Sequence, residues 1–150
     1  STMEIEKALK ALTESSRLFF GFAEDEMLEL LKFCASASFK KSQIIFRENS
    51  SGGDMYIIIT GSVVIKKEGK TIDVIRVGEC FGEMGALSGE KRSAAAEAAG
   101  DLVLLVINDA KLENLRAEIR SKLFRNILLI IAERLRRRIE DTVRGGNHER

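Results

Sequence analysis

Residues 54–79 read DMYIIITGSVVIKKEGKTIDVIRVGE, a succession of three short runs rich in isoleucine and valine. Glycine interrupts these runs at Gly61 and Gly69, within the short segments TGS and KEGK. Branched and aromatic side chains favour strands, and glycine favours tight reversals between them. We therefore predict three consecutive antiparallel strands joined by turns at residues 60–62 and 67–70.

The strand pattern continues on both sides of this segment. Upstream, residues 38–49 read SFKKSQIIFREN and contain further apolar, strand-forming residues. Downstream, residues 93–109 read SAAAEAAGDLVLLVIND and supply two runs separated at Gly100-Asp101. The alanines alone are equally compatible with a helix, but the flanking turn residues favour a strand. Many short strands at regular spacing predict a mainly β fold, a small antiparallel roll or barrel.

Helical patterns bracket the predicted strands. Before them, EIEKALKAL at 4–12 and EDEMLELLKFC at 24–34 carry apolar residues at helical spacing, and an apolar elbow with Gly21 separates them. After them, Asn108-Asp109 offers an N-cap for a helix that begins with AKLENLRAEIR. We predict that SKLFRNILLIIAERLRRRIEDTV then forms one long helix, closed by Gly145-Gly146.

The length and the absence of a long linker indicate a single domain. We predict a helical N-terminus at about 4–35, a β-roll at about 37–107 and two C-terminal helices at about 109–144, all within one domain of 150 residues.

Composition excludes several classes of protein. Hydrophobic residues make up 45% of the chain and charged residues 31%, which is typical of a globular domain. The net charge is +1, so no strong overall field favours nucleic acid or membranes. The longest apolar runs, such as ILLIIA, are far shorter than the ~18 residues that a membrane span needs. Without an export signal either, we expect a cytoplasmic location.

The cysteines and the histidine argue against a metal or redox site. Cys34 and Cys80 are too few for a disulfide framework or an iron–sulfur cluster, and their apolar neighbours indicate buried, reduced thiols. The single histidine, His148, lies in the polar tail GGNHER. We therefore expect no metal, no cofactor and no enzymatic activity.

Residues 81–94 read FGEMGALSGEKRSA and look like a loop built around a ligand. Short glycine patterns are common, so a solvated turn is the simplest interpretation of the glycines alone. However, the three glycines allow backbone N–H groups to approach a ligand closely, and MGALS can form one helical turn. Glu83 is an acceptor suited to a sugar hydroxyl, and Arg92 offers a fork of donors suited to a phosphate. A compact nucleotide with a single phosphate and a free ribose hydroxyl satisfies both.

This stretch resembles the phosphate-binding cassette of the cyclic nucleotide-binding domain family. The triplet FGE, an apolar turn and the triplet RSA follow one another at the family spacing. The family includes the bacterial catabolite activator protein, the regulatory subunits of cyclic-AMP-dependent protein kinase and cyclic-nucleotide-gated channels. The elbow at 18–22 and the segment MYIIITGSVVI also lie where the family has them. The resemblance implies an antiparallel β-roll of the double-stranded β-helix, jelly-roll type, with N-terminal helices and two C-terminal helices.

The resemblance also implies roles for individual residues. Glu83 would accept a hydrogen bond from the ribose 2′-hydroxyl, while Arg92 and Ser93 would contact the cyclic phosphate. The implied ligand-binding set is Gly82, Glu83, Met84, Gly85, Arg92, Ser93 and Ala94. Serine at position 93, where threonine tends to accompany cyclic GMP preference in this family, favours cyclic AMP.

Two positions depart from the common family pattern. Many members have alanine where Gly85 stands and proline where Lys91 stands. Glycine leaves the turn looser and lysine adds a charge near the phosphate, so we expect these changes to affect affinity rather than the class of ligand.

In the family, the last helix closes over the base. Apolar residues recur here every four positions from Ile119 to Val143, and the inner ones are typical of a core-facing stripe. Leu128 and Ile131 are the candidate base-lid residues, and the outer part of the helix offers a surface for a homodimer. For the basic residues at 134–138 we favour a solvated face with Glu–Arg pairs over contact with nucleic acid. We find no DNA-binding helix-turn-helix and no membrane segment in this sequence.

Three function classes follow from these observations. The first is a regulatory sensor that binds cyclic AMP or cyclic GMP and signals through its C-terminal helices, either as a stand-alone receptor or as part of a larger protein. The second is an interaction or dimerisation module that kept the roll but lost the ligand, which the intact Glu83, Arg92 and Ser93 argue against. The third, a phosphodiesterase, lacks the histidines and acidic clusters that such chemistry uses.

Overall fold

The computed structural model describes residues 16–148, together with residues 7, 10, 12 and 14. The helix predicted at 4–12 lies largely outside the described residues, although residues 7, 10 and 12 are helical. After it come the 3-10 turn η1 (Arg17–Phe19) and the helix α2 (Glu24–Lys32), joined through Gly21 at a φ of 83°. None of the helices in the described part of the chain is both long and apolar enough to cross a membrane.

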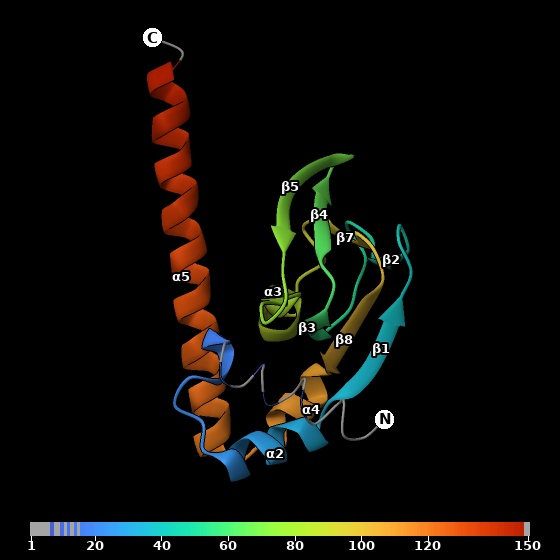
Figure 1. The fold of residues 1–150 in the computed structure, drawn as a ribbon, viewed down its shortest axis with the longest axis vertical. Helices are drawn as coiled ribbons and strands as arrows, with labels where there is room; N and C mark the ends of the chain where they lie inside the picture. The colour runs from blue at the N-terminus through green and yellow to red at the C-terminus, as the bar shows by residue number, and fades with distance from the viewer. Residues whose placement is uncertain (1–6, 8–9, 11, 13, 15, 149–150) are drawn as a thin grey trace.

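Two four-stranded antiparallel sheets form the β-roll between the helices (Figure 1). One sheet has the order β1-β8-β3-β6 and the other the order β2-β7-β4-β5, so strands from both ends of the roll lie side by side. The strands are β1 (Ala35–Phe39), β2 (Ile44–Phe46), β3 (Met55–Thr60), β4 (Val63–Lys67), β5 (Lys70–Ile75), β6 (Cys80–Phe81), β7 (Ala95–Ala98) and β8 (Leu102–Ile107). The predicted mainly β roll with helical ends is confirmed.

The central strand β3 explains why the sequence MYIIIT is apolar without alternation. Met55 and Ile57 pack into the cluster formed with the helices, while Tyr56 and Ile58 pack into the cluster between the two sheets. Successive side chains of a strand point to opposite faces, so a strand covered on both faces must be apolar at every position. The chain therefore has two cores, one inside the roll and one beneath it.

The predicted turns have the backbone geometry that their glycines allow. Glu68 and Gly69 have φ angles of 51° and 77°, as expected for a two-residue hairpin loop between β4 and β5. Gly61 has a φ of 92°, and a Cβ atom there would overlap the carbonyl oxygen of Asp101. Glycine at position 61 is thus required both by the backbone and by the packing of the loop before β8.

The break between the two C-terminal helices differs from the prediction. The first, α4 (Asp109–Glu113), ends earlier than expected, and the second, α5, begins already at Ala117. Leu115, which is 4% exposed, packs into the core at the break between them. The N-cap is confirmed, because the Asn108 side chain accepts a hydrogen bond from the N–H of Ala110 at 2.9 Å.

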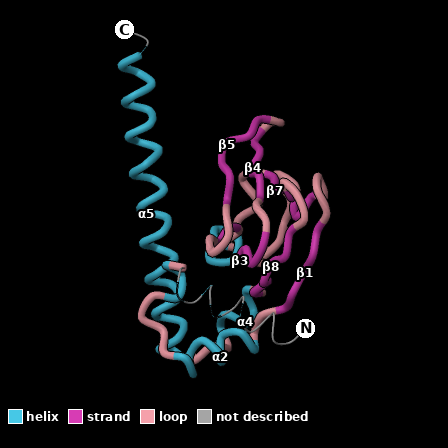
Figure 2. The backbone as a smooth tube through the Cα atoms, viewed as in Figure 1, coloured by secondary structure: helices cyan, strands magenta, loops and turns pink. Residues whose placement is uncertain are grey.

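The long helix does not close at the two glycines. Helix α5 spans Ala117–His148, and neither Gly145 nor Gly146 has the left-handed conformation of a helix-ending glycine. Glycine weakens a helix by only ~1 kcal/mol per residue, so it permits a stop without imposing one. Figure 2 shows α5 running alongside the roll and extending past it.

Hydrogen bonds fasten the inner half of α5 to the N-terminal elbow. The side-chain amide of Asn126, which is 3% exposed, donates to the carbonyls of Leu18 at 2.7 Å and Phe20 at 2.9 Å. Lys122 donates to the Glu26 carboxylate on α2 at 2.6 Å. These contacts fix the base of the long helix, so its direction relative to the roll is set by the elbow.

Candidate functional site

The stretch 81–94 folds into a short helix between two left-handed glycines. Gly82, at a φ of 77°, ends β6 and caps α3 (Glu83–Ser88), and Gly89 follows it at a φ of 70°. The helical turn that the sequence predicted is confirmed. The first N–H groups of any helix lack intrahelical partners, so those of α3 are available to an acceptor.

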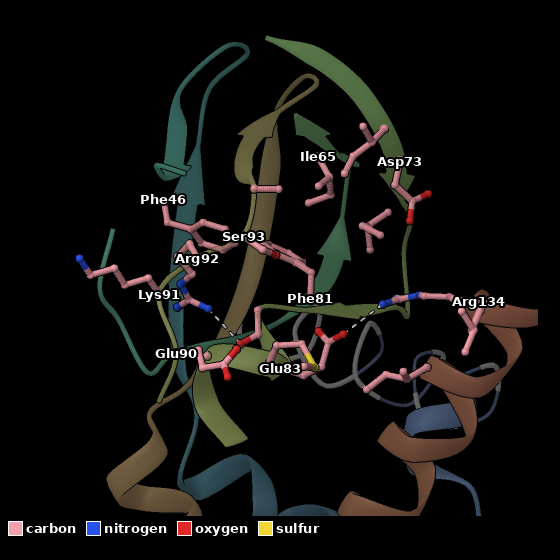
Figure 3. Close-up of a pocket in the computed structure, with 18 of the residues that line it drawn as sticks. Phe46, Ile65, Asp73, Phe81, Glu83, Glu90, Lys91, Arg92, Ser93 and Arg134 are labelled. Carbon is pink, nitrogen blue, oxygen red and sulfur yellow. Dashed lines mark hydrogen bonds and ion pairs between the residues drawn. The ribbon is translucent and has the colours of Figure 1, made fainter. Parts of the chain in front are cut away.

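A cavity of about 440 Å³ lies between α3, the β4–β5 hairpin and helix α5 (Figure 3). All seven residues of the predicted ligand-binding set line it. Its walls are completed by Phe46, Ile65, Ile72, Asp73, Ile75, Phe81, Glu90, Lys91, Ile131, Arg134, Leu135 and Arg138. The structure thus brings together the residues that the sequence singled out and adds a second, partly apolar wall opposite them.

Arg92 is a buried cation at one side of this cavity. It is 5% exposed, and its Nη1 and Nη2 donate to the carbonyls of Gly82 at 2.9 Å and Asp54 at 2.8 Å. Its Cζ lies 4.2 Å from the centroid of the Phe46 ring. Among the described residues no carboxylate forms an ion pair with Arg92, and its Nε is buried without a hydrogen-bond partner.

Glycines make the space that Arg92 occupies. A Cβ atom at Gly85 would lie 2.8 Å from Nη1 of Arg92, and one at Gly52 would lie 3.3 Å from Nη2. Both distances are shorter than ordinary van der Waals contacts between a methyl group and a nitrogen. The glycine at 85, which departs from the alanine of many family members, is therefore matched to this position of the arginine.

Glu83 lies on the other side of α3 from Arg92, toward the long helix (Figure 3). It is 8% exposed, and its Oε1 is 3.5 Å from Nη1 of Arg134. Arg134 also donates from Nη2 to the carbonyl of Cys80 at 2.7 Å. Because the ion-pair contact is long, the carboxylate keeps acceptor capacity for a hydroxyl group.

The remaining cassette residues differ in exposure. Ser93 is exposed, and the Lys67 ammonium donates to its carbonyl at 2.8 Å. Ala94 is 9% exposed, whereas Met84 is 57% exposed at the cavity rim. The serine hydroxyl is therefore open to solvent and to a ligand.

Burial sets the protonation state of the Cys80 thiol, which lies next to the site. It raises the pKa of Cys80 to about 12, with the nearby Glu83 carboxylate adding to the rise. Burial likewise raises the pKa of Cys34 to about 12. Both thiols are free in the structure and protonated at neutral pH, in line with the predicted reduced thiols, although Cys34 is only partly buried.

Of the two candidate lid residues, the structure brings only Ile131 to the cavity. Leu128 is 67% exposed and does not line the cavity. Ile131 is followed on the same face of α5 by Arg134, Leu135 and Arg138, all of which contribute to the wall. The part of α5 that lines the cavity therefore lies further toward the C-terminus than the predicted pair of residues.

The basic segment at 134–138 separates into two pairs of arginines. Arg136 and Arg137 point to solvent and form ion pairs with Glu133, as the solvated-face interpretation predicted. Arg134 and Arg138 instead reach the roll, and sequence reasoning missed both. Their spacing of three and seven residues from Ile131, which places all three on one face of the helix, could have identified them in the sequence.

The chain matches the family described as cyclic nucleotide-binding domain over residues 36–118, more than half of its length. It is also 34% identical over 92 residues to a cGMP-dependent protein kinase of Eimeria tenella, a match that covers 61% of this chain and 9% of the kinase. The chain thus spans only a small part of this curated relative.

Solved structures support the same assignment of the fold. A cyclic nucleotide-binding domain from Methylobacillus flagellatus superposes with a TM-score of 0.82 at 22% identity, covering 93% of this chain and 83% of the other. The catabolite activator protein of Thermus thermophilus gives a TM-score of 0.75 at 27% identity, covering 85% of this chain and 62% of the other.

Proposed function

Since the chain belongs to the cyclic nucleotide-binding domain family, we propose that it binds a cyclic mononucleotide, with cyclic AMP favoured over cyclic GMP, and acts as a regulatory sensor. Its role is then to bind and report a ligand, and no catalytic step is assigned to any of its residues.

One observation carries this proposal: the buried guanidinium of Arg92 has no anion beside it in the described part of the chain. A buried charge is strongly unfavourable unless it is paired, so an anion supplied from outside would stabilise it. The first residues of α3, Glu83, Met84 and Gly85, line the same cavity, and the first N–H groups of a helix lack intrahelical partners. A singly charged phosphate diester fits this set of donors and needs no metal ion.

The other groups in the cavity suit the rest of a cyclic nucleotide. Glu83 would accept a hydrogen bond from the ribose 2′-hydroxyl, and Ser93 would add a hydroxyl contact to the phosphate. The apolar residues Ile65, Ile72 and Ile131 would face the base. We assign the preference for cyclic AMP from Ser93, whose hydroxyl stands where threonine tends to accompany cyclic GMP preference in the family.

We further propose that ligand binding is transmitted through the C-terminal helices. Ile131, Arg134 and Leu135 of α5 line the same cavity as the phosphate-binding cassette, so a ligand there contacts both elements. A ligand that binds better when α5 is closed shifts the equilibrium toward the closed form.

Thermal unfolding with cyclic AMP, cyclic GMP and linear 5′-AMP tests the proposed function. A ligand at about 100 times its dissociation constant stabilises the fold by roughly 2.7 kcal/mol, which raises the melting temperature by several degrees. We expect cyclic AMP to raise it most, cyclic GMP less and 5′-AMP not at all. The absence of a shift with either cyclic nucleotide would contradict the proposal and favour a ligand-free interaction module.

The role of Glu83 is tested by removing its proposed hydrogen bond with the ribose, either by changing the carboxylate or by removing the 2′-hydroxyl. Glu83→Ala should weaken the binding of cyclic AMP, and 2′-deoxy cyclic AMP should bind the parent protein more weakly for the same reason. We expect the variant and the parent to bind the 2′-deoxy ligand about equally, since each change removes the same bond. Additive losses would place the 2′-hydroxyl elsewhere.

A second copy of the chain is the proposed protein partner. Leu128, Leu135, Ile139 and Val143 on α5 are each between 57% and 67% exposed. An exposed apolar stripe on a helix is typical of a helix–helix interface. Sedimentation analysis of the parent and of a Leu135→Glu, Ile139→Glu variant should show a dimer for the parent only; a monomeric parent at high concentration would contradict this assignment.

A further inference from the structure

Two arginines four residues apart on α5 contact two different elements that line the cavity; the contact of Arg134 with Glu83 is shown in Figure 3. Arg134, whose side chain is 22% exposed, contacts Glu83 of α3 and the carbonyl of Cys80. Arg138 contacts Asp73 of β5, with its Nη2 lying 3.6 Å from Oδ2. Both carboxylates line the cavity, so each contact joins the long helix to a different part of the site.

We propose that Arg134 and Arg138 are positioning residues that hold α5 across the cavity before any ligand is present, and that they set how long a bound ligand is retained. The second half of this statement rests on the proposed function; the first half concerns the ligand-free protein alone. The two contacts are named here the lid ion pairs.

The neighbouring Arg136 shows that not every arginine of this segment contacts the roll. Arg136 forms ion pairs with Glu133 and Glu140 of its own helix at 2.7 and 3.2 Å, and its side chain is 63% exposed. It therefore adds charge to the helix without joining it to the roll. Within the described part of the chain, Arg134 and Arg138 on the cavity face of this segment form ion pairs with other elements, whereas Arg136 and Arg137 form theirs within α5.

The lid ion pairs differ in how strongly water screens them. Glu83 and Arg134 are both largely buried, and the short bond from Arg134 to the Cys80 carbonyl holds the guanidinium independently of Glu83. A ribose hydroxyl can therefore bind Glu83 while Arg134 stays in place. The Asp73 and Arg138 side chains are 34% and 60% exposed, so this contact is the more sensitive to salt.

Charge reversal at the exposed pair tests the proposal. In Arg138→Asp, two carboxylates face each other and should repel the helix from β5; in Asp73→Arg, two arginines do the same. The double variant Asp73→Arg, Arg138→Asp restores opposite charges in exchanged positions. Arg136→Asp is the matched control, because it makes the same charge change on the same helix away from the cavity.

The first readout needs no ligand. A spin-label pair on Lys70, at the tip of the β4–β5 hairpin, and Arg144, on the outer part of α5, reports their separation in a Cys34→Ser background. We expect both single reversals to broaden and lengthen the distance distribution, and the double variant and the Arg136→Asp control to match the parent.

The second readout is the release rate of a fluorescent cyclic AMP analogue. An ion pair with this exposure is worth up to about 1 kcal/mol, so each single reversal should speed release by roughly two- to fivefold. We expect the double variant to release at the parent rate and the difference to disappear at high salt.

The outcomes separate this inference from the proposed function. If the parent binds no cyclic nucleotide but the distances change as expected, the proposed function fails and the Asp73–Arg138 contact stands as one that holds α5. If the parent binds and neither single reversal changes the distance distribution or the release rate, the proposal that both arginines hold α5 is refuted. Failure of the double variant to restore the parent behaviour refutes them equally, since it would mean that the side chains act through something other than mutual attraction.

Discussion

Replacing Arg92 by alanine should remove most of the affinity for a cyclic nucleotide. The guanidinium is 5% exposed, is held by two backbone carbonyls and has no carboxylate beside it in the described chain. A bound phosphate would supply the counter-charge that no carboxylate of the described residues provides. Losing one partner of a buried charge pair costs about 2–5 kcal/mol, which corresponds to a roughly 30- to 4,000-fold higher dissociation constant.

A thermal-unfolding titration measures this loss directly. At a cyclic AMP concentration about 100 times the dissociation constant of the parent, the parent gains roughly 2.7 kcal/mol of stability. A 30-fold weaker variant gains less than about 1 kcal/mol at the same concentration, and a much weaker one gains nothing. The melting temperature without ligand shows whether the variant still folds.

Two further variants make the test specific for the buried guanidinium. Arg92→Lys keeps the charge but loses the planar fork of donors, so we expect an intermediate affinity. Lys91→Ala removes an equal charge from the adjacent exposed side chain and should change affinity by less than about 1 kcal/mol. If Arg92→Ala bound like the parent, or if Lys91→Ala lost as much affinity, Arg92 would not be the phosphate-binding group.

Three other predictions concern the fold itself. In urea unfolding, Gly69→Ala should lower the free energy of unfolding by the ~1–2 kcal/mol that a left-handed backbone costs a residue with a Cβ, because the space around it is open. Gly61→Ala should lower it by more than this, because the new Cβ also overlaps the carbonyl oxygen of Asp101. Hydrogen bonds, the largest from the Lys122 side chain, lower the pKa of Glu26. The ionised Glu26 therefore stabilises the fold above its ordinary pKa of 4.5, and this stabilisation is lost as the pH falls through the lowered pKa. A Glu26→Gln variant should accordingly lose less stability than the parent between pH 6 and pH 3. Because burial raises the pKa of Cys80 to about 12, Ellman's reagent at pH 8 should label this thiol only after unfolding; rapid labelling of the folded protein would show an exposed site.

The strands and the cassette were predictable because their signals are local. A run such as MYIIITGSVVI carries strand preference and a turn glycine within a few residues, and α3 is fixed by the glycines at both of its ends. The ends of the C-terminal helices were not predictable to the same degree. Whether a helix stops at Gly145 or breaks near Leu115 depends on what the neighbouring elements bury, which no short window of sequence contains.

The sequence by itself determined the alternation of strands and turns, the helices at both ends and the residue types of a phosphate- and sugar-binding loop. Each of these follows from propensities and spacings within a few residues of one another. Only the tertiary structure decided that Arg92 is buried with no counter-charge among the described residues and that Ile131 rather than Leu128 faces the cavity. It also decided that Arg134 and Arg138 leave the solvated face to contact Glu83 and Asp73. The placement of the α5 residues depends on the direction of this helix relative to the roll, which contacts between residues far apart in the chain set.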